Sequence, residues 1–135
     1  MRRVIPATAV LCLSACAQSD DISRDAEPFG GIAESEVITA MGTEPFWSVK
    51  ITGDKATFSN PENSQGEPFA VSRFAGNNGL GFSGELDGQS FTLTVTLGDC
   101  SDGMSDRTFP YTATLSWGGE TVFGCAYTDI QSYTQ

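Results

Sequence analysis

The 135-residue sequence contains no histidine, the side chain that most often serves as a general base or a zinc ligand. Without it, the usual pairs of a nucleophile and a base are missing. No phosphate-binding loop and no dinucleotide-binding glycine motif occurs either. A carboxylate pair for glycoside hydrolysis remains open, but with 17 acidic residues such a pair is expected by chance. The sequence therefore predicts a protein that is not an enzyme and needs no cofactor.

Basic residues are scarce: seven lysines and arginines stand against 17 aspartates and glutamates, which gives a net charge of −10. Phosphate backbones are bound through lysine and arginine, so this composition argues against a nucleic acid as partner. It argues equally against docking on anionic lipid through a basic patch. The acidic surface is compatible with a basic protein partner, although solubility alone also explains it.

Long apolar runs are also missing. The stretch at residues 4–13 is much shorter than the roughly 20 residues that span a bilayer. It follows the basic start MRR and precedes the segment LSAC at residues 13–16, an order typical of a secretory signal peptide. The LSAC segment resembles the lipobox of bacterial lipoproteins, which implies a signal peptide of residues 1–15 and a lipid on Cys16. Ordinary cleavage after Ala15-Cys16-Ala17 is the alternative.

The predicted cleavage fixes the expected location and charge of the mature chain. Loss of Arg2 and Arg3 leaves five basic against 17 acidic residues, a net charge of −12. Ala17, rather than an aspartate, follows Cys16 and favours the outer membrane of a Gram-negative host, facing the periplasm. The lipid anchor would then hold the chain on that membrane.

The four cysteines agree with export. Cys12 leaves with the signal peptide and Cys16 carries the lipid, so that Cys100 and Cys125 remain. In an oxidising compartment these two predict one disulfide. The alternative is a metal site, but two isolated thiols without histidine do not make a zinc site.

The mature chain divides into a tether and a domain. Residues 16–41 are polar and acidic, which predicts a flexible tether behind the lipid. Within it, residues 34–40 fit either a short helix or a first strand. Residues 42–135 make up the predicted domain.

Two-residue turns of glycine and aspartate organise this domain into hairpins. The turns are Gly53-Asp54, Asp87-Gly88 and Gly118-Gly119. Around each turn, the register places large apolar side chains on one face, as where Phe82 meets Leu93. We therefore predict an all-β fold, an antiparallel meander of six to eight strands that closes as a small barrel or a sandwich.

Two motifs carry a resemblance to a known family. The segment GTEPFWS at residues 42–48, and the segment CSDGMSDRTFPY at residues 100–111 with GCA at 124–126, resemble motifs of small bacterial envelope lipoproteins of unknown function. That group is similar in setting to META heat-shock-type domains and to lysozyme-inhibitor domains. Phe109 stands where the group usually has tyrosine. The resemblance implies an envelope location and a fold, but no activity.

Both motifs have a functional and a structural interpretation. At residues 42–47, Glu44 beside two aromatic residues fits a rim that binds a cation or a sugar, whereas Pro45 and Trp47 also fit a rigid strand entry and a plug at a barrel end. At residues 99–107, three aspartates suggest calcium, but their spacing does not match an EF-hand. Turn chemistry explains the aspartates better, so we predict no metal site.

The loop held by the disulfide is the best candidate for a functional surface, because it is polar and constrained. The predicted binding surface comprises Glu44, Trp47, Asp102, Met104, Asp106, Arg107 and Tyr111.

These features predict a non-catalytic structural, stress-related or protein-interaction module of the cell envelope. The alternative is a module that inhibits a cationic envelope-targeting enzyme such as c-type lysozyme. Lysozyme-inhibitor lipoproteins carry a Ser-Gly-x-x-Tyr segment, which residues 83–87 match only in part.

Overall fold

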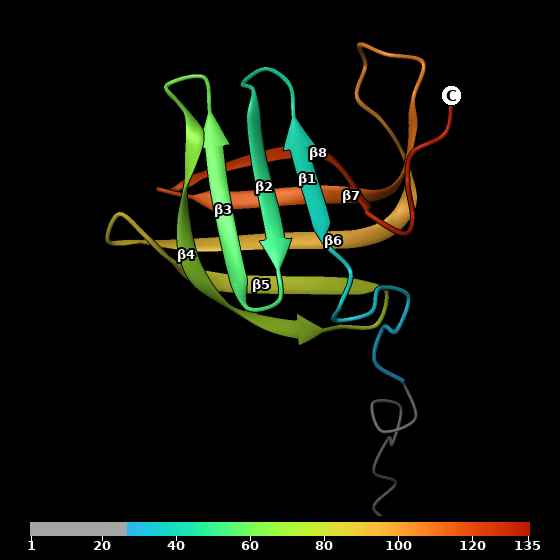
Figure 1. Cartoon of the computed structure of the whole chain (residues 1–135), viewed down its shortest axis with the longest axis horizontal. Coiled ribbons are helices and arrows are strands. Elements are labelled where there is room, and N and C mark those ends of the chain that lie inside the picture. Colours follow the sequence, from blue (N-terminus) through green and yellow to red (C-terminus); the bar gives the residue numbers. More distant parts are fainter. Residues whose placement is uncertain (1–26) are drawn as a thin grey trace, which may run out of the picture.

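A computed structural model describes residues 27–135, which form a closed barrel of eight antiparallel strands (Figure 1). The strands follow one another around the barrel in sequence order, and β1 pairs with β8 at the seam. The strands are β1 (Ile38–Gly42), β2 (Trp47–Thr52), β3 (Lys55–Asn60), β4 (Asn63–Ala75), β5 (Gly79–Leu86), β6 (Gln89–Ser101), β7 (Thr108–Trp117) and β8 (Glu120–Thr128). The predicted all-β meander with one disulfide is confirmed, and its closure is that of a barrel. The predicted signal peptide and Cys16 lie outside the described residues.

The predicted hairpin registers are confirmed. The pairs found across them are Val49–Phe58, Ile51–Ala56, Leu80–Val95, Phe82–Leu93, Gly84–Phe91 and Leu115–Val122. At the β5–β6 turn, Asp87 and Gly88 have φ of 53° and 74°. Two consecutive residues with positive φ give the turn a twist that matches that of the flanking strands, which fixes the register.

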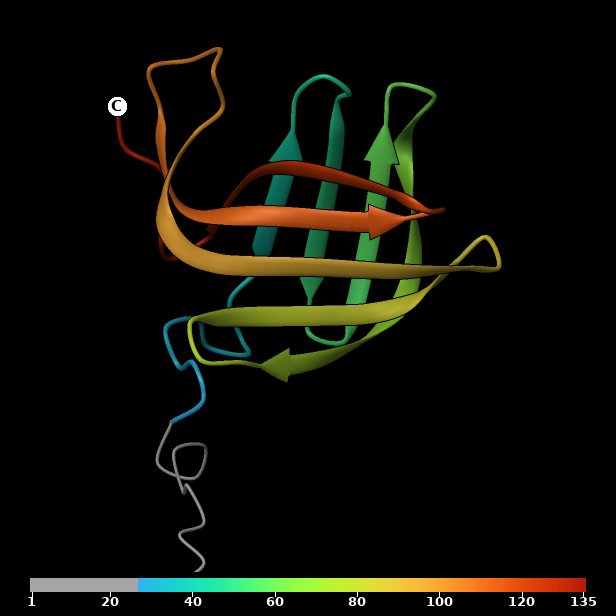
Figure 2. The same ribbon diagram turned by 180° about the vertical axis from the view of Figure 1, so that it is seen from behind.

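The core fills the space between two layers of strands that cross. Figures 1 and 2 show β1, β2 and β3 running steeply across the flatter course of β5 to β8. Alternate residues point inward, and Phe82, Phe91 and Tyr111 are among the largest fully buried side chains. An eight-stranded barrel has an interior just wide enough for such side chains to fill. A partner of this barrel therefore has to bind at its surface or its ends.

The connections between strands gather at opposite ends. In Figures 1 and 2 the β1–β2 turn, the β3–β4 turn and the β6–β7 loop lie at one end of the steep strands. Residues 27–37 enter from the other end. The first end, which carries both sequence motifs, therefore lies away from the side where the N-terminal segment arrives.

The boundary expected at residue 42 needs a correction. Of the two alternatives for residues 34–40, the structure has the strand, because β1 begins at Ile38 and pairs with both β2 and β8. Phe29 packs against the core, and Ile32 is buried. Residues 29–41 thus belong to the barrel rather than to the predicted tether. Within the described part of the chain, no helix has the length and apolar character needed to cross a membrane.

Glu36 ties the entering segment to the end of the chain. Its carboxylate accepts hydrogen bonds from the hydroxyl of Thr128 at 2.7 Å, from Nε2 of Gln131 at 3.0 Å and from the amide of Ala33 at 2.6 Å. Tyr111 donates to Oε1 of the same Gln131 at 2.7 Å. The Thr128 hydroxyl, followed by Gln131, lowers the pKa of Glu36 because these donors favour the charged carboxylate.

This network makes the stability of the barrel depend on pH. A carboxyl group whose pKa is lowered by folding stabilises the folded chain above its unfolded pKa of about 4.3, and this stabilisation is lost as pH falls through the folded value. Glu36→Gln should therefore lower the melting temperature at pH 7, and the difference from the parent should shrink below pH 4. Thermal unfolding followed by circular dichroism measures it, with the exposed Glu34→Gln as control. If the melting temperatures of the parent and Glu36→Gln differed by the same amount at every pH, the charge of Glu36 would not be the source of its stabilising effect.

Candidate functional site

The structure brings only part of the predicted binding surface together. Trp47, Asp102 and Met104 line one hollow at the end of the barrel that carries the motifs. Tyr111 does not belong there: it is 1% exposed and its hydroxyl points to Gln131 in the network around Glu36. The prediction for Tyr111 was wrong, because strand parity places it inside the barrel. The remaining members, Glu44, Asp106 and Arg107, lie in the turn and the loop beside the hollow without lining it.

Trp47 closes the interior beneath the β1–β2 turn. It is only 5% exposed and belongs to the core cluster. Its indole lies against Gly42, where a Cβ atom would come within 2.0 Å of Nε1. This agrees with the expected plug, and it explains why residue 42 has no side chain. Nε1 of Trp47 is buried and has no hydrogen-bond partner in the described structure, an arrangement that costs roughly 1–3 kcal/mol.

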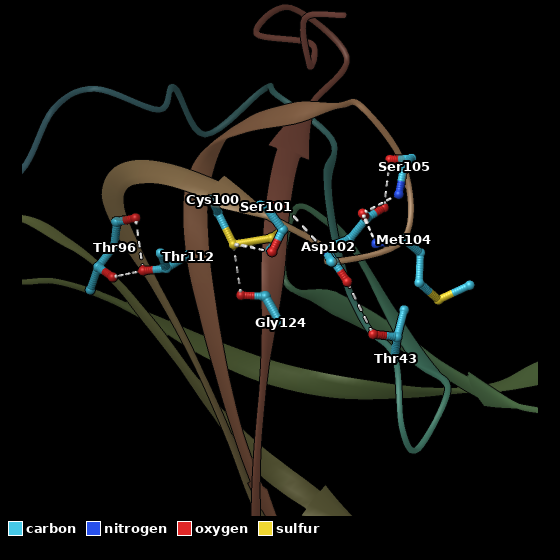
Figure 3. Close-up of a disulfide and its surroundings, with 11 residues drawn as sticks. Thr43, Thr96, Cys100, Ser101, Asp102, Met104, Ser105, Thr112 and Gly124 are labelled. Atoms are coloured by element: carbon cyan, nitrogen blue, oxygen red, sulfur yellow. Dashed lines mark hydrogen bonds between the residues drawn. A yellow bond between two sulfur atoms is a disulfide. The ribbon is translucent and has the colours of Figure 1, made fainter.

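Asp102 stabilises the β6–β7 loop through hydrogen bonds within the loop. Its carboxylate accepts hydrogen bonds from the amides of Met104 at 2.9 Å and Ser105 at 2.8 Å, and from the Ser105 hydroxyl at 2.8 Å. Figure 3 shows these contacts. The amide of Ser105, then that of Met104, lowers the pKa of Asp102, which keeps this side chain charged. Turn chemistry thus accounts for Asp102. Among residues 27–135, no group of three or more acidic or cysteine side chains is placed to hold a metal ion.

The disulfide holds this loop against the barrel. Cys100 and Cys125 are joined as predicted, with their Cα atoms 5.6 Å apart. Beyond the disulfide, the hydroxyl of Thr43 donates to the carbonyl oxygen of Asp102 at 3.3 Å (Figure 3). The disulfide therefore joins the end of β6, directly before the loop, to β8, and the loop itself is bonded to the β1–β2 turn.

Between these segments lies a cavity of about 550 Å³, which we call the barrel-end hollow. Its floor includes Met41, Ser48 and Ser59, which are register partners across β1, β2 and β3 and lie on the outer face of the sheet. The β6–β7 loop forms one wall and the β3–β4 turn contributes another. Its lining residues are Met41, Gly42, Thr43, Phe46, Trp47, Ser48, Ser59, Asn60, Pro61, Ser64, Asp102, Met104 and Ser105.

The rim of the hollow combines exposed apolar side chains with negative charge. Phe46 and Met104 are 52% and 66% exposed, and unlike the other exposed large apolar side chains of the described residues they both line this hollow. No lysine or arginine lines the hollow, whereas the segments around it carry Glu44, Glu62, Asp102 and Asp106. The one basic residue of the β6–β7 loop is Arg107, whose Cζ atom lies 4.2 Å from the centroid of the Tyr133 ring. The hollow therefore presents an apolar surface in a negative field.

Comparisons with known proteins add no relative to this description. No family model matches the chain, and no curated protein sequence or solved structure is significantly similar to it. The resemblance to envelope lipoproteins drawn from the two motifs thus stays a prediction.

Proposed function

We propose that this chain is a lipid-anchored protein of the bacterial cell envelope whose barrel is a non-catalytic protein-interaction module. The observation that carries the proposal is the barrel-end hollow with its exposed rim of Phe46 and Met104. Exposed apolar patches on an otherwise acidic surface typically mark interaction sites. The filled interior leaves the barrel surface for binding, and this hollow of about 550 Å³ opens on that surface.

The position of the hollow fits an anchored protein. The N-terminal segment enters the barrel at the end opposite to the motifs (Figures 1 and 2). A lipid on Cys16 would attach the barrel to the membrane from that side. The hollow lies at the end away from the attachment, where a partner in the periplasm reaches it.

Two measurements in the same living cells test the protein-interaction module and the lipid anchor. The full chain is expressed with a photo-crosslinking amino acid at Met104 or, as matched control, at Phe74, which is 72% exposed on β4. Irradiation should give a discrete adduct from position 104 and none from position 74. The same cells, fed a tagged fatty acid, should label the parent chain and not a Cys16→Ala variant.

The outcomes separate the anchor from the binding module. Equal labelling of the Cys16→Ala variant would refute lipidation at that cysteine. Identical adducts from Met104 and Phe74, or no adduct from either, would refute the hollow as a protein-interaction site.

A further inference from the structure

We propose that the barrel-end hollow binds a positively charged polypeptide segment that inserts an apolar side chain; this rests on the proposed interaction module and specifies the partner it takes. The apolar side chain enters between Phe46 and Met104, and the positive charges face the acidic rim. The interaction is therefore amphipathic, with each part of the segment matched to a different part of the hollow.

The apolar lining is suited to side chains of variable shape. Met41 and Met104 lie on the floor and the wall, and methionine adapts its three rotatable bonds to irregular partners. Phe46 adds an exposed aromatic face that holds apolar groups and also attracts cations. A hollow lined in this way selects for an apolar anchor without fixing its identity.

The charge around the hollow selects the sign of the partner. The β1–β2 turn, the β3–β4 turn and the β6–β7 loop bring Glu44, Glu62, Asp102 and Asp106 to this end of the barrel. Arg107, whose guanidinium lies over Tyr133 and whose charge also acts on Asp102, is the one basic side chain of these three segments, so the four carboxylates leave this end with a net negative charge. An acidic segment or an anionic lipid headgroup is repelled here, whereas lysine and arginine side chains are attracted.

The polar part of the lining is suited to a peptide backbone. Asn60 at the end of β3 adds an amide group whose Oδ1 already accepts a hydrogen bond from the amide of Asn63 at 2.9 Å. Ser48, Ser59 and Ser64 place hydroxyl groups along the floor and at the start of β4. Such groups both donate and accept, so they can satisfy the N–H and C=O groups that an extended segment brings with it. A cavity of about 550 Å³ holds a few residues rather than a folded domain.

The test uses the unlipidated Cys16→Ala chain, labelled with ¹⁵N and with its disulfide formed. The probe is a short unstructured peptide of glycine, lysine and leucine. One twin carries glutamate in place of lysine, and a second carries serine in place of leucine. The sequence has two tryptophans, whose indole N–H signals serve as reporters. Trp47 lines the hollow, whereas Nε1 of Trp117 donates to the carbonyl of Leu86 at 3.0 Å and lies outside it.

We expect the lysine–leucine peptide to shift the Trp47 indole signal and to leave that of Trp117 in place. Both twins should bind at least about tenfold more weakly, since each lacks one of the two features that the hollow selects. Raising the salt from low concentration to about 0.15 M should weaken binding of the lysine–leucine peptide several-fold, because the charges lie at an exposed rim.

Matched variants assign the effect to the hollow. Phe46→Ser should weaken binding about tenfold, whereas Phe74→Ser, which also removes an exposed phenylalanine, should not. Glu44→Gln with Glu62→Gln should weaken binding about fivefold at low salt. Glu85→Gln with Asp87→Asn, an equal loss of charge at the β5–β6 turn, should have little effect.

The results distinguish failure of this inference from failure of the proposed function. Equal binding of the glutamate twin at the Trp47 signal would overturn the charge requirement and leave the interaction module standing. Equal binding of the serine twin would likewise overturn the apolar anchor. If no peptide moved the Trp47 signal, or if Phe46→Ser and Phe74→Ser behaved alike, the hollow would be rejected as a peptide site.

Discussion

The double variant Cys100→Ala with Cys125→Ala should unfold with a free energy about 3 kcal/mol below that of the parent. The disulfide closes a loop across a sequence separation of 25, and a crosslink of that span removes conformational entropy from the unfolded chain. In the folded chain it joins the end of β6, directly before the β6–β7 loop, to β8. Urea unfolding of the unlipidated chain, followed by tryptophan fluorescence, measures the loss.

Reduction of the parent chain provides the control for this prediction. Cys125 is almost fully buried, so its replacement by alanine also leaves a small void. A reduced parent keeps both sulfur atoms and loses only the covalent link. We therefore expect reduction to account for most of the 3 kcal/mol. If the oxidised and the reduced parent were equally stable, the loop would be held by its hydrogen bonds alone.

The hairpins could be predicted from the sequence because their determinants are local. Two-residue turns such as Asp87-Gly88 fix which residues face each other, and the apolar pattern of the strands then checks the register. The six strands predicted around these turns correspond to β2, β3, β5, β6, β7 and β8.

The other two strands lack such local signals. In β1, four residues pair with β8, whose residues lie more than 80 positions away, and no turn connects the two. In β4, Gly66 has φ of 83°, and Pro68 has no backbone N–H to donate to the sheet. The strand also lacks a regular alternation of buried and exposed residues. β1 depends on the closure of the barrel against β8, which becomes visible only in three dimensions. β4 pairs with its sequence neighbours β3 and β5, but its irregular pattern hides it in the sequence.

The candidate site likewise contains residues that local sequence signals identify and residues that only the folded chain brings together. The two motifs pointed to Trp47, Asp102 and Met104, because unusual residues concentrate in two short segments, the second of which begins at a cysteine of the disulfide. The sequence also held the signal that excludes Tyr111, since hairpin parity places it on the same face as Leu115. Ser48 and Ser59 could not have been found, because only the folded chain brings the β6–β7 loop and the β3–β4 turn around them.

The second large effect is expected where the barrel closes. At the seam, Gly124 of β8 approaches β1 so closely that a Cβ atom would lie 2.0 Å from the carbonyl oxygen of Met41 and 3.0 Å from Cα of Gly42. These are backbone atoms, which cannot turn away as a side chain can. Gly124→Ala should therefore force β1 and β8 apart and cost about 3 kcal/mol, the upper end of the usual penalty for overpacking.

Gly81→Ala is the matched control for the seam. Gly81 lies within β5, and a Cβ atom added there would meet nothing within 4 Å. Alanine in this open strand position should leave the stability unchanged or raise it by about 0.5 kcal/mol, because it restricts the unfolded chain. Urea unfolding compares the two variants.

Because Met41 and Gly42 also line the barrel-end hollow, Gly124→Ala should weaken peptide binding at temperatures where the chain is still folded. Equal stability of the two variants would mean that β1 shifts along the seam without cost, and the hollow could then not be a preformed site.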